Sequence, residues 1–397
     1  MKKTLFFVIL FFIAGHFLNA QAPCITDVEY SLVSLKQVPK AKKMMDECFP
    51  GNESSPKAWL VRANVYIQYY EYEIERKNKD PKYTINVPDA ILIANESFYK
   101  TLELNPDIKA SPGLMDPKDG QLLSAPSIHD LAAKCMEKKD YAEAIKLLNI
   151  VIRSYRADLK GYAKYLAYAY LDLADCYKAL GDDANYKKTL IDATKLNIPI
   201  PAIYLNLYDL YKQENDTVKC GEILTQARKI IPDSLALDVR GYELDYYAMI
   251  GDSAKLIDAA LKMFEKNKDN VEVINIVAGH LINNKVYTLA EEIINAGLAI
   301  DQKDFELYQQ MAYRFYSEAD DYDKMKEDKY KLKKYLEAEK LLNQANEILK
   351  TSVIWAEKAY NINKEDKLHN IMYYQTLVRL MMDVPEDLQG KIKSYYK

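Results

Sequence analysis

The chain has 397 residues, with 54 basic and 58 acidic side chains and a formal net charge of −4. A mildly acidic chain offers no electrostatic attraction for nucleic acid, so we expect no nucleic-acid partner. Tyrosine is strongly favoured, with 33 residues against 10 phenylalanines and 2 tryptophans. This bias suits a thin, two-layer fold in which a ring packs inward while its hydroxyl reaches water.

Residues 1–20 have the pattern of a signal peptide. Lys2 and Lys3 give a positive start, an apolar run follows at 5–14, and small residues lead up to Ala20. Because a bilayer span takes about 20 apolar residues, an uncleaved anchor is the weaker alternative. Proline at position 23 argues against lipid attachment at Cys24. We expect export, cleavage near Ala20 that moves the net charge from −4 to −6, and no membrane span.

The clearest element of the remaining chain is a pair of helices between Pro199 and Asp233. The first helix has one apolar face and the second another, on either side of a polar turn at 215–216; the two faces consist of Tyr204, Leu207, Tyr208 and Tyr211, and of Cys220, Leu224, Ala227 and Ile231. Neither helix can bury its face alone, so the pair needs a similar neighbour on each side. The pattern returns with a period of about 34 residues.

The chain after residue 20 is predicted to divide into four segments. Residues 21–105 hold two short helices that meet at Pro39 and a first pair interrupted by a polar insert at 78–87. Residues 106–126 carry four prolines and two glycines and are predicted to be an irregular connection. The helix pairs resume over 127–365, with a charged insert near 320–334, and residues 366–397 form helices that would cap the open end.

The repeated pattern resembles the tetratricopeptide repeat (TPR) over about 26–382. It combines a bulky and a small residue four positions apart, an aromatic residue, glycine-aspartate turns at 181–182 and 251–252, and a closing proline at 232. The split first repeat, the charged insert and the tail helices are similar to a group of exported TPR proteins of Bacteroidota. This resemblance implies an all-α solenoid, a right-handed superhelix of stacked antiparallel helix pairs. It also implies a periplasmic location, associated with the outer membrane, and no particular reaction.

In TPR proteins the first helices line a concave groove, where partners dock. The same groove position is occupied in successive repeats by Asn64, Ala133, Asp175, Asp209, Asp245, Gly279 and Tyr313. The three aspartates predict an acidic row that attracts a basic segment of a partner. In the alternative, Lys178 and Lys212 neutralise the row locally.

Other features of the groove bear on its ligand. Tyr316 shares the face of Tyr313, and both are candidate contact residues. Leu60 stands beside Asn64 where some family members have the lysine of a carboxylate clamp, so recognition of a free C-terminus is not expected.

Five cysteines remain after cleavage, and Cys24 and Cys48 are a candidate disulfide between the first helices. The other three, Cys135, Cys176 and Cys220, lie in helical patterns and are expected to be small buried hydrophobes. No pair has the spacing of zinc ligands, so we expect no metal and no cofactor.

Three turns resemble the aspartate–serine/threonine–aliphatic acceptor of O-linked glycans in exported Bacteroidota proteins. The candidate residues are Thr217, Ser234 and Ser253. Aspartate, serine and threonine are also ordinary N-cap residues, and that alternative stays open.

Catalytic chemistry has little support in the sequence. His129, His280 and His369 have no second ligand at metal spacing, His129–Asp130 is a weak dyad, and no phosphate loop, GxSxG or HExxH motif occurs. We therefore expect no enzyme but a periplasmic scaffold that binds protein partners, for example in outer-membrane protein assembly or transport. The alternatives are a glycan-binding protein that uses exposed tyrosines, and an enzyme with an unrecognised site. Partner identity and oligomeric state stay open.

Overall fold

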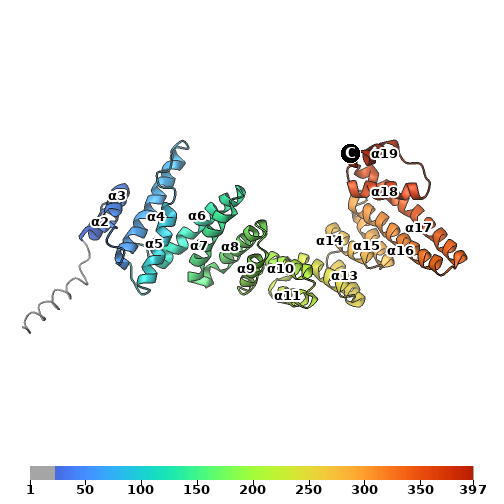
Figure 1. The fold of residues 1–397 in the computed structure, drawn as a ribbon, viewed down its shortest axis with the longest axis horizontal. Coiled ribbons are helices and arrows are strands. Elements are labelled where there is room, and N and C mark those ends of the chain that lie inside the picture. The colour runs from blue at the N-terminus through green and yellow to red at the C-terminus, as the bar shows by residue number, and fades with distance from the viewer. Residues whose placement is uncertain (1–22, 397) are drawn as a thin grey trace, which may run out of the picture. The chain divides into compact units, whose positions relative to one another are not determined.

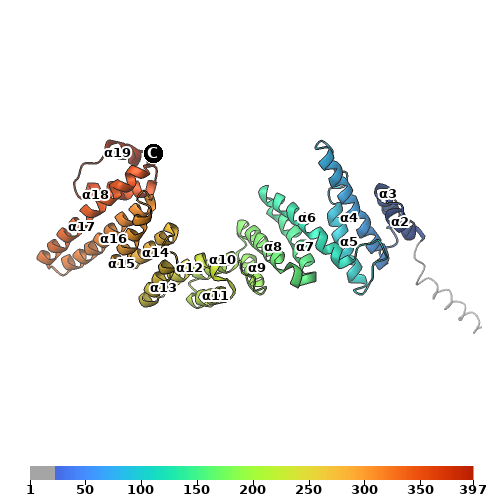
Figure 2. The same cartoon turned by 180° about the vertical axis from the view of Figure 1, so that it is seen from behind.

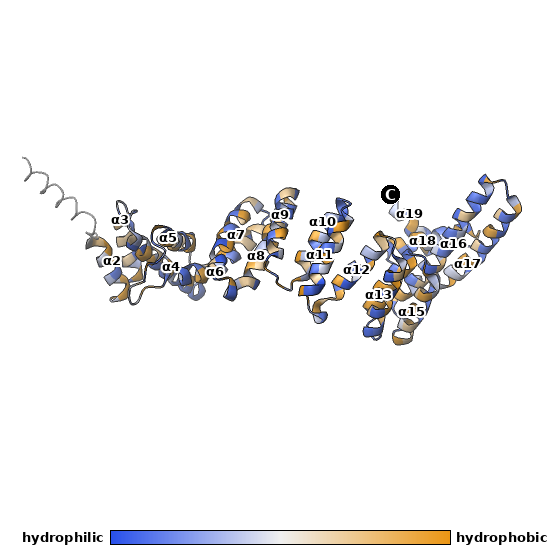
Figure 3. Ribbon diagram, turned by 90° about the horizontal axis from the view of Figure 1, so that it is seen from below, coloured by the Kyte–Doolittle hydropathy of each residue, from blue (hydrophilic) through white to orange (hydrophobic). Residues whose placement is uncertain are grey.

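The computed structural model describes residues 23–396, so the predicted signal peptide lies outside the described residues. Within this range every regular element is a helix, which confirms the all-α class, and most helices adjacent in sequence within each unit pack against each other. The chain divides into two compact units between Ile203 and Tyr204. A right-handed superhelix is a property of the path of the whole chain, and the two units are described separately. The superhelix therefore stays a prediction. Figure 3 shows hydrophobic and hydrophilic residues along each helix, as expected of helices with one buried face.

The first unit is built from helices joined in sequence (Figure 1): α2 (Pro23–Val33), α3 (Val38–Cys48), α4 (Pro56–Lys79), α5 (Ala90–Leu104), α6 (Pro117–Glu137), α7 (Tyr141–Tyr155), the short 3-10 helix η1 (Arg156–Asp158), α8 (Leu159–Ala179) and α9 (Asp183–Thr194). The two short N-terminal helices are those expected on either side of Pro39, which occupies the first turn of α3. Helix α8 begins at the position expected from its extended apolar pattern, with Asp158 as its N-cap.

Two anchors hold the N-terminal part of this unit. Cys24 and Cys48 form a disulfide with Cα atoms 6.0 Å apart, so the structure places the predicted pair together. The polar insert after α4 is held by the buried carboxylate of Glu73, which accepts hydrogen bonds from the Tyr83 hydroxyl at 2.8 Å and the Asn86 amide N–H at 2.6 Å. A largely polar insert is thus held by hydrogen bonds to one buried carboxylate.

The predicted connection at 106–126 is too long. Helix α6 begins at Pro117, so only Asn105 to Asp116 lies outside helices. Proline is favoured in the first helical turn, where its missing N–H has no partner to lose, and the Asp116 side chain caps that turn by accepting from Lys118 N–H at 3.0 Å. Pro126 lies inside α6 on the exposed side, and Gly120 meets the Phe98 ring of α5.

The second unit continues the pattern, seen from the other side in Figure 2: α10 (Pro201–Gln213), α11 (Thr217–Ile230), η2 (Asp233–Leu235), α12 (Leu237–Met249), α13 (Ser253–Lys266), α14 (Val271–Asn283), α15 (Tyr287–Ile300), α16 (Phe305–Lys331), α17 (Tyr335–Ile362), α18 (Lys367–Arg379) and α19 (Glu386–Tyr395). Contacts also join α12 to α14 and α14 to α16, so the first helices of successive pairs lie side by side. This is the arrangement expected of TPR-like pairs.

The charged stretch at 320–334 is not a separate insert. Helix α16 runs through it to Lys331 and pairs with α17 along its length. Charges at helical spacing pair along α16, as in Asp320–Lys324 at 2.7 Å, while Ala319, Ala345 and Leu349 form an apolar seam between the two helices. Charge on one face and small apolar residues on the other therefore extend the helix instead of interrupting it.

Several turns between paired helices share one construction. A residue with positive φ ends the first helix, and the aspartate after it caps the second at the turns before α7, α9, α11 and α13. Glycine serves at Gly181 and Gly251, with φ of 71° and 72°, and Asp182 and Asp252 follow as N-caps. Lysine or asparagine takes the same conformation at other turns, for example Lys285 with φ of 63°. The glycine-aspartate signal in the sequence thus has a direct backbone cause.

Candidate interaction surfaces

Two of the predicted groove aspartates lie in a network of hydrogen bonds between α10 and α12. Asp245 accepts from the Tyr208 hydroxyl at 2.8 Å and from Lys212 Nζ at 2.7 and 2.8 Å. Asp209 accepts from the Tyr242 hydroxyl at 3.0 Å, and the Tyr208 and Tyr242 rings meet edge to face at 5.1 Å. Side chains of one pair therefore bind those of the next.

This network corrects the prediction of an open acidic row. The charge of Asp245 is compensated by Lys212, which reaches across to the next pair instead of along its own helix to Asp209. Burial, with Asp209 beside it, raises the pKa of Tyr242 to about 12, so its hydroxyl stays a donor. Burial also lowers the pKa of His280, although nearby Asp245 opposes the shift. The hydroxyls of Tyr208 and Tyr242 thus donate to carboxylates, whereas the sequence predicted that tyrosine hydroxyls would reach water.

Asp175 belongs to the first unit, on α8, and is exposed. Neighbouring groups still displace part of the water around its carboxylate, and this desolvation, together with the nearby carboxylate of Asp172, raises the pKa of Asp175. Asp172 itself pairs with His129 Nε2 at 2.5 Å, so His129 meets this carboxylate and not the adjacent Asp130. The weak dyad read from the sequence is therefore wrong in its partner.

Asn64 is not available to a partner protein. Its side chain is 1% exposed, and its amide holds the backbone of Met115 from both sides, accepting from the Met115 N–H at 2.6 Å and donating to the Met115 carbonyl at 3.3 Å. The predicted groove position on α4 is thus filled by the connection that leads into α6. Sequence spacing could not show this, because the two residues are 51 positions apart.

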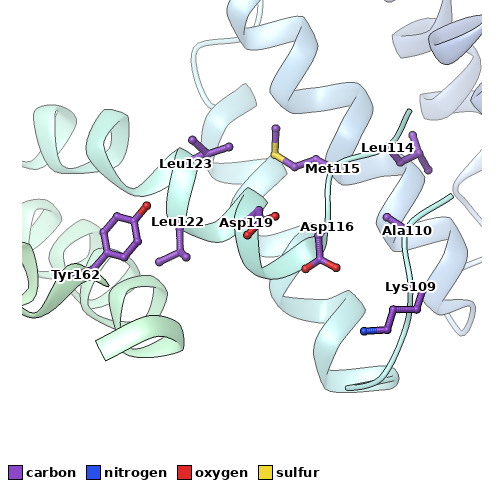
Figure 4. Close-up of a pocket in the computed structure, with 9 residues that line it drawn as sticks. All are labelled: Lys109, Ala110, Leu114, Met115, Asp116, Asp119, Leu122, Leu123 and Tyr162. Atoms are coloured by element: carbon purple, nitrogen blue, oxygen red, sulfur yellow. The ribbon is translucent and has the colours of Figure 1, made fainter. Parts of the chain in front are cut away.

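The same connection forms one wall of an open hollow of about 640 Å³ (Figure 4). Its other walls come from the start of α6 and from α8, and the lining residues are Lys109, Ala110, Leu114, Met115, Asp116, Asp119, Leu122, Leu123 and Tyr162. Tyr162 stacks on Tyr155 with ring centroids 5.5 Å apart, and the exposed Tyr165 lies 6.0 Å from both rings. The lining of the hollow therefore combines apolar side chains with charged ones, and an aromatic group stands at one side.

A second cavity, of about 690 Å³, lies among α11, α12 and α13 and is lined by charged residues. Its charges are paired: Arg228 with Glu243 at 2.9 Å, Arg240 with Asp233 at 2.8 Å, and Lys262 with Asp258 at 2.6 Å. Such pairing leaves little net attraction for an ion, so we assign no ligand to it.

The two predicted groove tyrosines meet in a third pocket, of about 340 Å³, which we name the C-terminal pocket. It is lined by Gln309, Gln310, Tyr313 and Tyr316 of α16 and by Leu368, His369, Ile371, Met372 and Gln375 of α18. Each set recurs every three to four positions, so each is one face of its helix, and the two faces oppose each other. Tyr313 is 40% exposed and Leu368 is 79% exposed, which leaves apolar surface at the mouth.

The C-terminal pocket is supported from behind by buried contacts. Ser352 of α17 donates to the Ala312 carbonyl of α16 at 2.8 Å, and the His369 ring packs edge to face on Phe305 at 5.7 Å. Sequence analysis missed the contribution of α18, because its apolar stripe was assigned to a cap. The signal was present in the spacing of Leu368, Ile371 and Met372.

The three candidate glycan acceptors are exposed at turns. Thr217 and Ser253 are the first residues of α11 and α13, and Ser234 lies in η2. The aspartates before Thr217 and Ser253 act as N-caps, so the structural alternative accounts for both. Whether the hydroxyls carry glycans stays a prediction.

The remaining predictions concern the cysteines outside the disulfide, metal sites and membrane spans. Cys176 and Cys220 are buried, and burial raises the pKa of each thiol to about 11, so both stay protonated. Cys135 is only half-buried. Over residues 23–396, no cluster of three or more histidines, cysteines or acids could hold a metal ion. In the same range, no helix is both long and apolar enough to cross a bilayer.

Comparison with known proteins gives fold-level similarity alone. No protein-family model matches the chain, and no curated protein does. Among solved structures, the C-terminal part of a TPR repeat-containing protein from Cytophaga hutchinsonii is similar at 16% identity, with 62% of this chain and 98% of that one covered and a TM-score of 0.36. Yeast Tom70 is similar at 12% identity, with coverage of 93% and 91% and a TM-score of 0.34. A TPR repeats protein from Bacteroides fragilis is similar at 14% identity, with 79% of this chain and 98% of that one covered and a TM-score of 0.22. Similarities this weak carry no argument about function, which rests on the surfaces described above.

Proposed function

We propose that this chain is a TPR-like scaffold that binds a protein partner at the C-terminal pocket. The observation that carries the proposal is the pocket itself, because the two tyrosines predicted as contact residues line it together with the exposed side chain of Leu368. Partially exposed aromatic and aliphatic side chains around a hollow are typical of the anchor regions of protein interfaces.

The scaffold is proposed to act in the periplasm, in outer-membrane protein assembly or transport. Support comes from the signal-like pattern of residues 1–20 and from the disulfide between Cys24 and Cys48, since disulfides persist in exported proteins. A basic segment of the partner remains part of the proposal at Asp175 in the first unit and, as a separate contact, at Asp209 in the second, because Lys212 already compensates Asp245.

A test is affinity purification of tagged protein from its native cells after mild crosslinking, with mass spectrometry of the proteins recovered. Tyr313→Ala is compared with Tyr335→Ala, which removes a tyrosine that is 61% exposed near the start of α17 and outside the pocket. The proposal predicts a partner that is lost with Tyr313→Ala and kept with Tyr335→Ala. A partner kept by both variants would place the site elsewhere.

One observation favours a second candidate, glycan binding in the first unit. The tyrosines at 155, 162 and 165 lie ring beside ring, with Tyr162 at the edge of the open hollow. Aromatic rings of this kind can stack on sugar faces. Binding to a glycan array that disappears with Tyr165→Ala, while Tyr335→Ala still binds, would establish this candidate; a blank array would remove it.

A further inference from the structure

The hairpin of α16 and α17 ends in an exposed segment, residues 329–336, which we name the hairpin tip. Half of its residues are lysines, and it contains no acidic residue. The other half is apolar and exposed, with Leu332 at 65% and Leu336 at 77%. The rings of Tyr330 and Tyr335, one from each helix, lie 6.1 Å apart and complete this half. Apolar surface that stays in water is unfavourable, so the tip is suited to being covered by a partner.

The hairpin tip stands beyond the contacts that hold α16 in the second unit. Asp321 accepts from the Tyr287 hydroxyl of α15 at 2.7 Å, and Asp323 pairs with Arg379 of α18. Helix α16 runs on for about two turns after Asp323, or about 12 Å. Figures 1 and 3 show the joined ends of α16 and α17 extending past α15 and α18. The tip is therefore a convex end that a flat surface can reach.

Positive charge gathers around the hairpin tip. Residues 324–337 carry six lysines against three carboxylates, a net charge of +3 in a chain whose total is −4. Two of these carboxylates pair with lysines of the tip: Lys331–Asp328 at 3.0 Å, Lys329–Glu337 at 2.7 Å and Lys334–Glu337 at 3.6 Å. Ion pairs this exposed are weak, so the lysines can exchange them for the anions of a partner.

We propose that the hairpin tip docks on a membrane surface that carries anionic lipids. Leu332 and Leu336 enter the boundary between headgroups and acyl chains. The two tyrosines of the tip lie at the level of the headgroups, where amphipathic rings are favoured, and the lysines meet lipid phosphates. The inference goes beyond the proposed function, because the tip begins 13 positions after Tyr316 on α16. That spacing is about 20 Å along the helix, so the C-terminal pocket and the tip can be occupied together.

A protein surface fits the hairpin tip less well. A stable protein interface takes about 20–30 residues from each partner, whereas the tip offers a few residues at a narrow end. A second copy of the chain would bring the same lysines to the contact, where like charges repel. A membrane covers a convex tip from all sides, and it offers apolar chains and phosphates together.

The first experiment is co-sedimentation with lipid vesicles of the purified chain without residues 1–20, whose apolar run would itself bind lipid. One set of vesicles is phosphatidylcholine with about one third phosphatidylglycerol, and the other is phosphatidylcholine alone. Each lysine near an anionic membrane strengthens binding about 5-fold, so the net charge around the tip predicts about 100-fold stronger binding to the anionic set. Added salt should weaken it. Equal binding to both sets, or no binding to either, would overturn the inference.

The double variant Leu332→Ser/Leu336→Ser tests the apolar part of the tip. It should weaken binding to the anionic vesicles by at least about 10-fold, because less apolar surface leaves water on docking. The matched control is Leu180→Ser/Leu235→Ser, which changes two leucines that are also at least half exposed but lie outside the tip. The control should bind like the unmodified chain. Vesicle binding that both double variants keep, or that both lose, would refute insertion of the tip.

Two triple lysine-to-glutamine variants test the charge of the tip. They remove the same charge from exposed lysines, one at the hairpin tip and the other at the end of α6: Lys331→Gln/Lys333→Gln/Lys334→Gln and Lys134→Gln/Lys138→Gln/Lys139→Gln. We expect the first to bind the anionic vesicles about 100-fold more weakly and the second to bind like the unmodified chain. An equal loss in the two variants would mean that binding follows the charge of the whole chain, and would refute the assignment to the tip.

Tryptophan fluorescence separates insertion into lipid from other ways of covering the tip. With Leu336→Trp, lipids brominated on their acyl chains should quench the fluorescence more than in the unmodified chain, whose Trp59 and Trp355 lie outside the tip. Vesicle binding without this added quenching would contradict insertion. A dimer in lipid-free solution that Leu332→Ser/Leu336→Ser abolishes would make a second copy of the chain the occupant, and would overturn the membrane proposal.

Discussion

Gly120→Ala is predicted to destabilise the first unit, although alanine normally favours a helix. Gly120 is the fourth residue of α6, and a Cβ built there would lie 2.3 Å from two ring atoms of Phe98 on α5. Real Cβ contacts are never this short, so α5 and α6 would have to separate. Phe98 is completely buried, and rings in a close-packed interior turn aside only when their neighbours move.

The magnitude follows from two opposing effects. Overpacking a filled core costs about 1–3 kcal/mol. Replacing glycine by alanine inside a helix contributes about 0.5–1 kcal/mol in the opposite direction. We expect a net loss of about 1–2 kcal/mol in the free energy of unfolding of the first unit. Gly390→Ala on α19 is the control, because a Cβ there meets nothing within 4 Å and the residue belongs to the second unit, so the unfolding of the first unit should not change.

The assay is urea unfolding followed by tryptophan fluorescence in a Trp355→Phe background. Trp59, on α4, then reports the unfolding of the first unit alone. A lower midpoint for Gly120→Ala with an unchanged m-value is the expected result. If Gly120→Ala raises the midpoint, α6 does not pack against Phe98 as described.

Three further predictions concern buried polar groups and turns, each measured by urea unfolding. Lys285→Gly should raise stability by about 0.5 kcal/mol, because relief of the strain of lysine at a φ of 63° outweighs the loss of the exposed ion pair with Asp321. Tyr208→Phe should cost about 1–2 kcal/mol, because it removes the hydroxyl that donates to Asp245; an unchanged midpoint would contradict the link between pairs. Glu73→Gln should lose about 2 kcal/mol at pH 7. Burial raises the pKa of Glu73, but hydrogen bonds from Asn86 and Tyr83 lower it by more, so its pKa in the folded chain lies below the ordinary value of 4.5. The stabilisation from the Glu73 carboxylate is therefore present above about pH 4.5 and is lost as the pH falls through the pKa of the folded state. Glu73→Gln should therefore show weaker destabilisation by acid than the unmodified chain.

Local sequence signals predicted the elements well. The start of α8 at Asp158 and the breaks at glycine-aspartate turns depend on caps and backbone conformation, which a few neighbouring residues determine. The connection before α6 was overestimated because proline was read only as a breaker. Pro117 instead starts a helix, and Pro126 stands on its exposed side.

The candidate sites were predicted less completely, because they depend on contacts between distant residues. Spacing placed Tyr313 and Tyr316 on one face, and the structure brings them into one pocket. Spacing could not show that Lys212 reaches Asp245, 33 positions away, or that Met115 covers Asn64. These contacts are set by how the helix pairs stack, and no local signal in the sequence reports them.

The central claim is that a protein partner sits over the C-terminal pocket, and site-specific photocrosslinking tests it most directly. A photoreactive phenylalanine analogue replaces Tyr313 in one strain and the exposed Tyr335 in another, and crosslinked products are identified by mass spectrometry after irradiation of intact cells. The account predicts a discrete protein adduct from position 313 and none of that identity from position 335. The absence of an adduct at 313, or the same adducts at both positions, would contradict it.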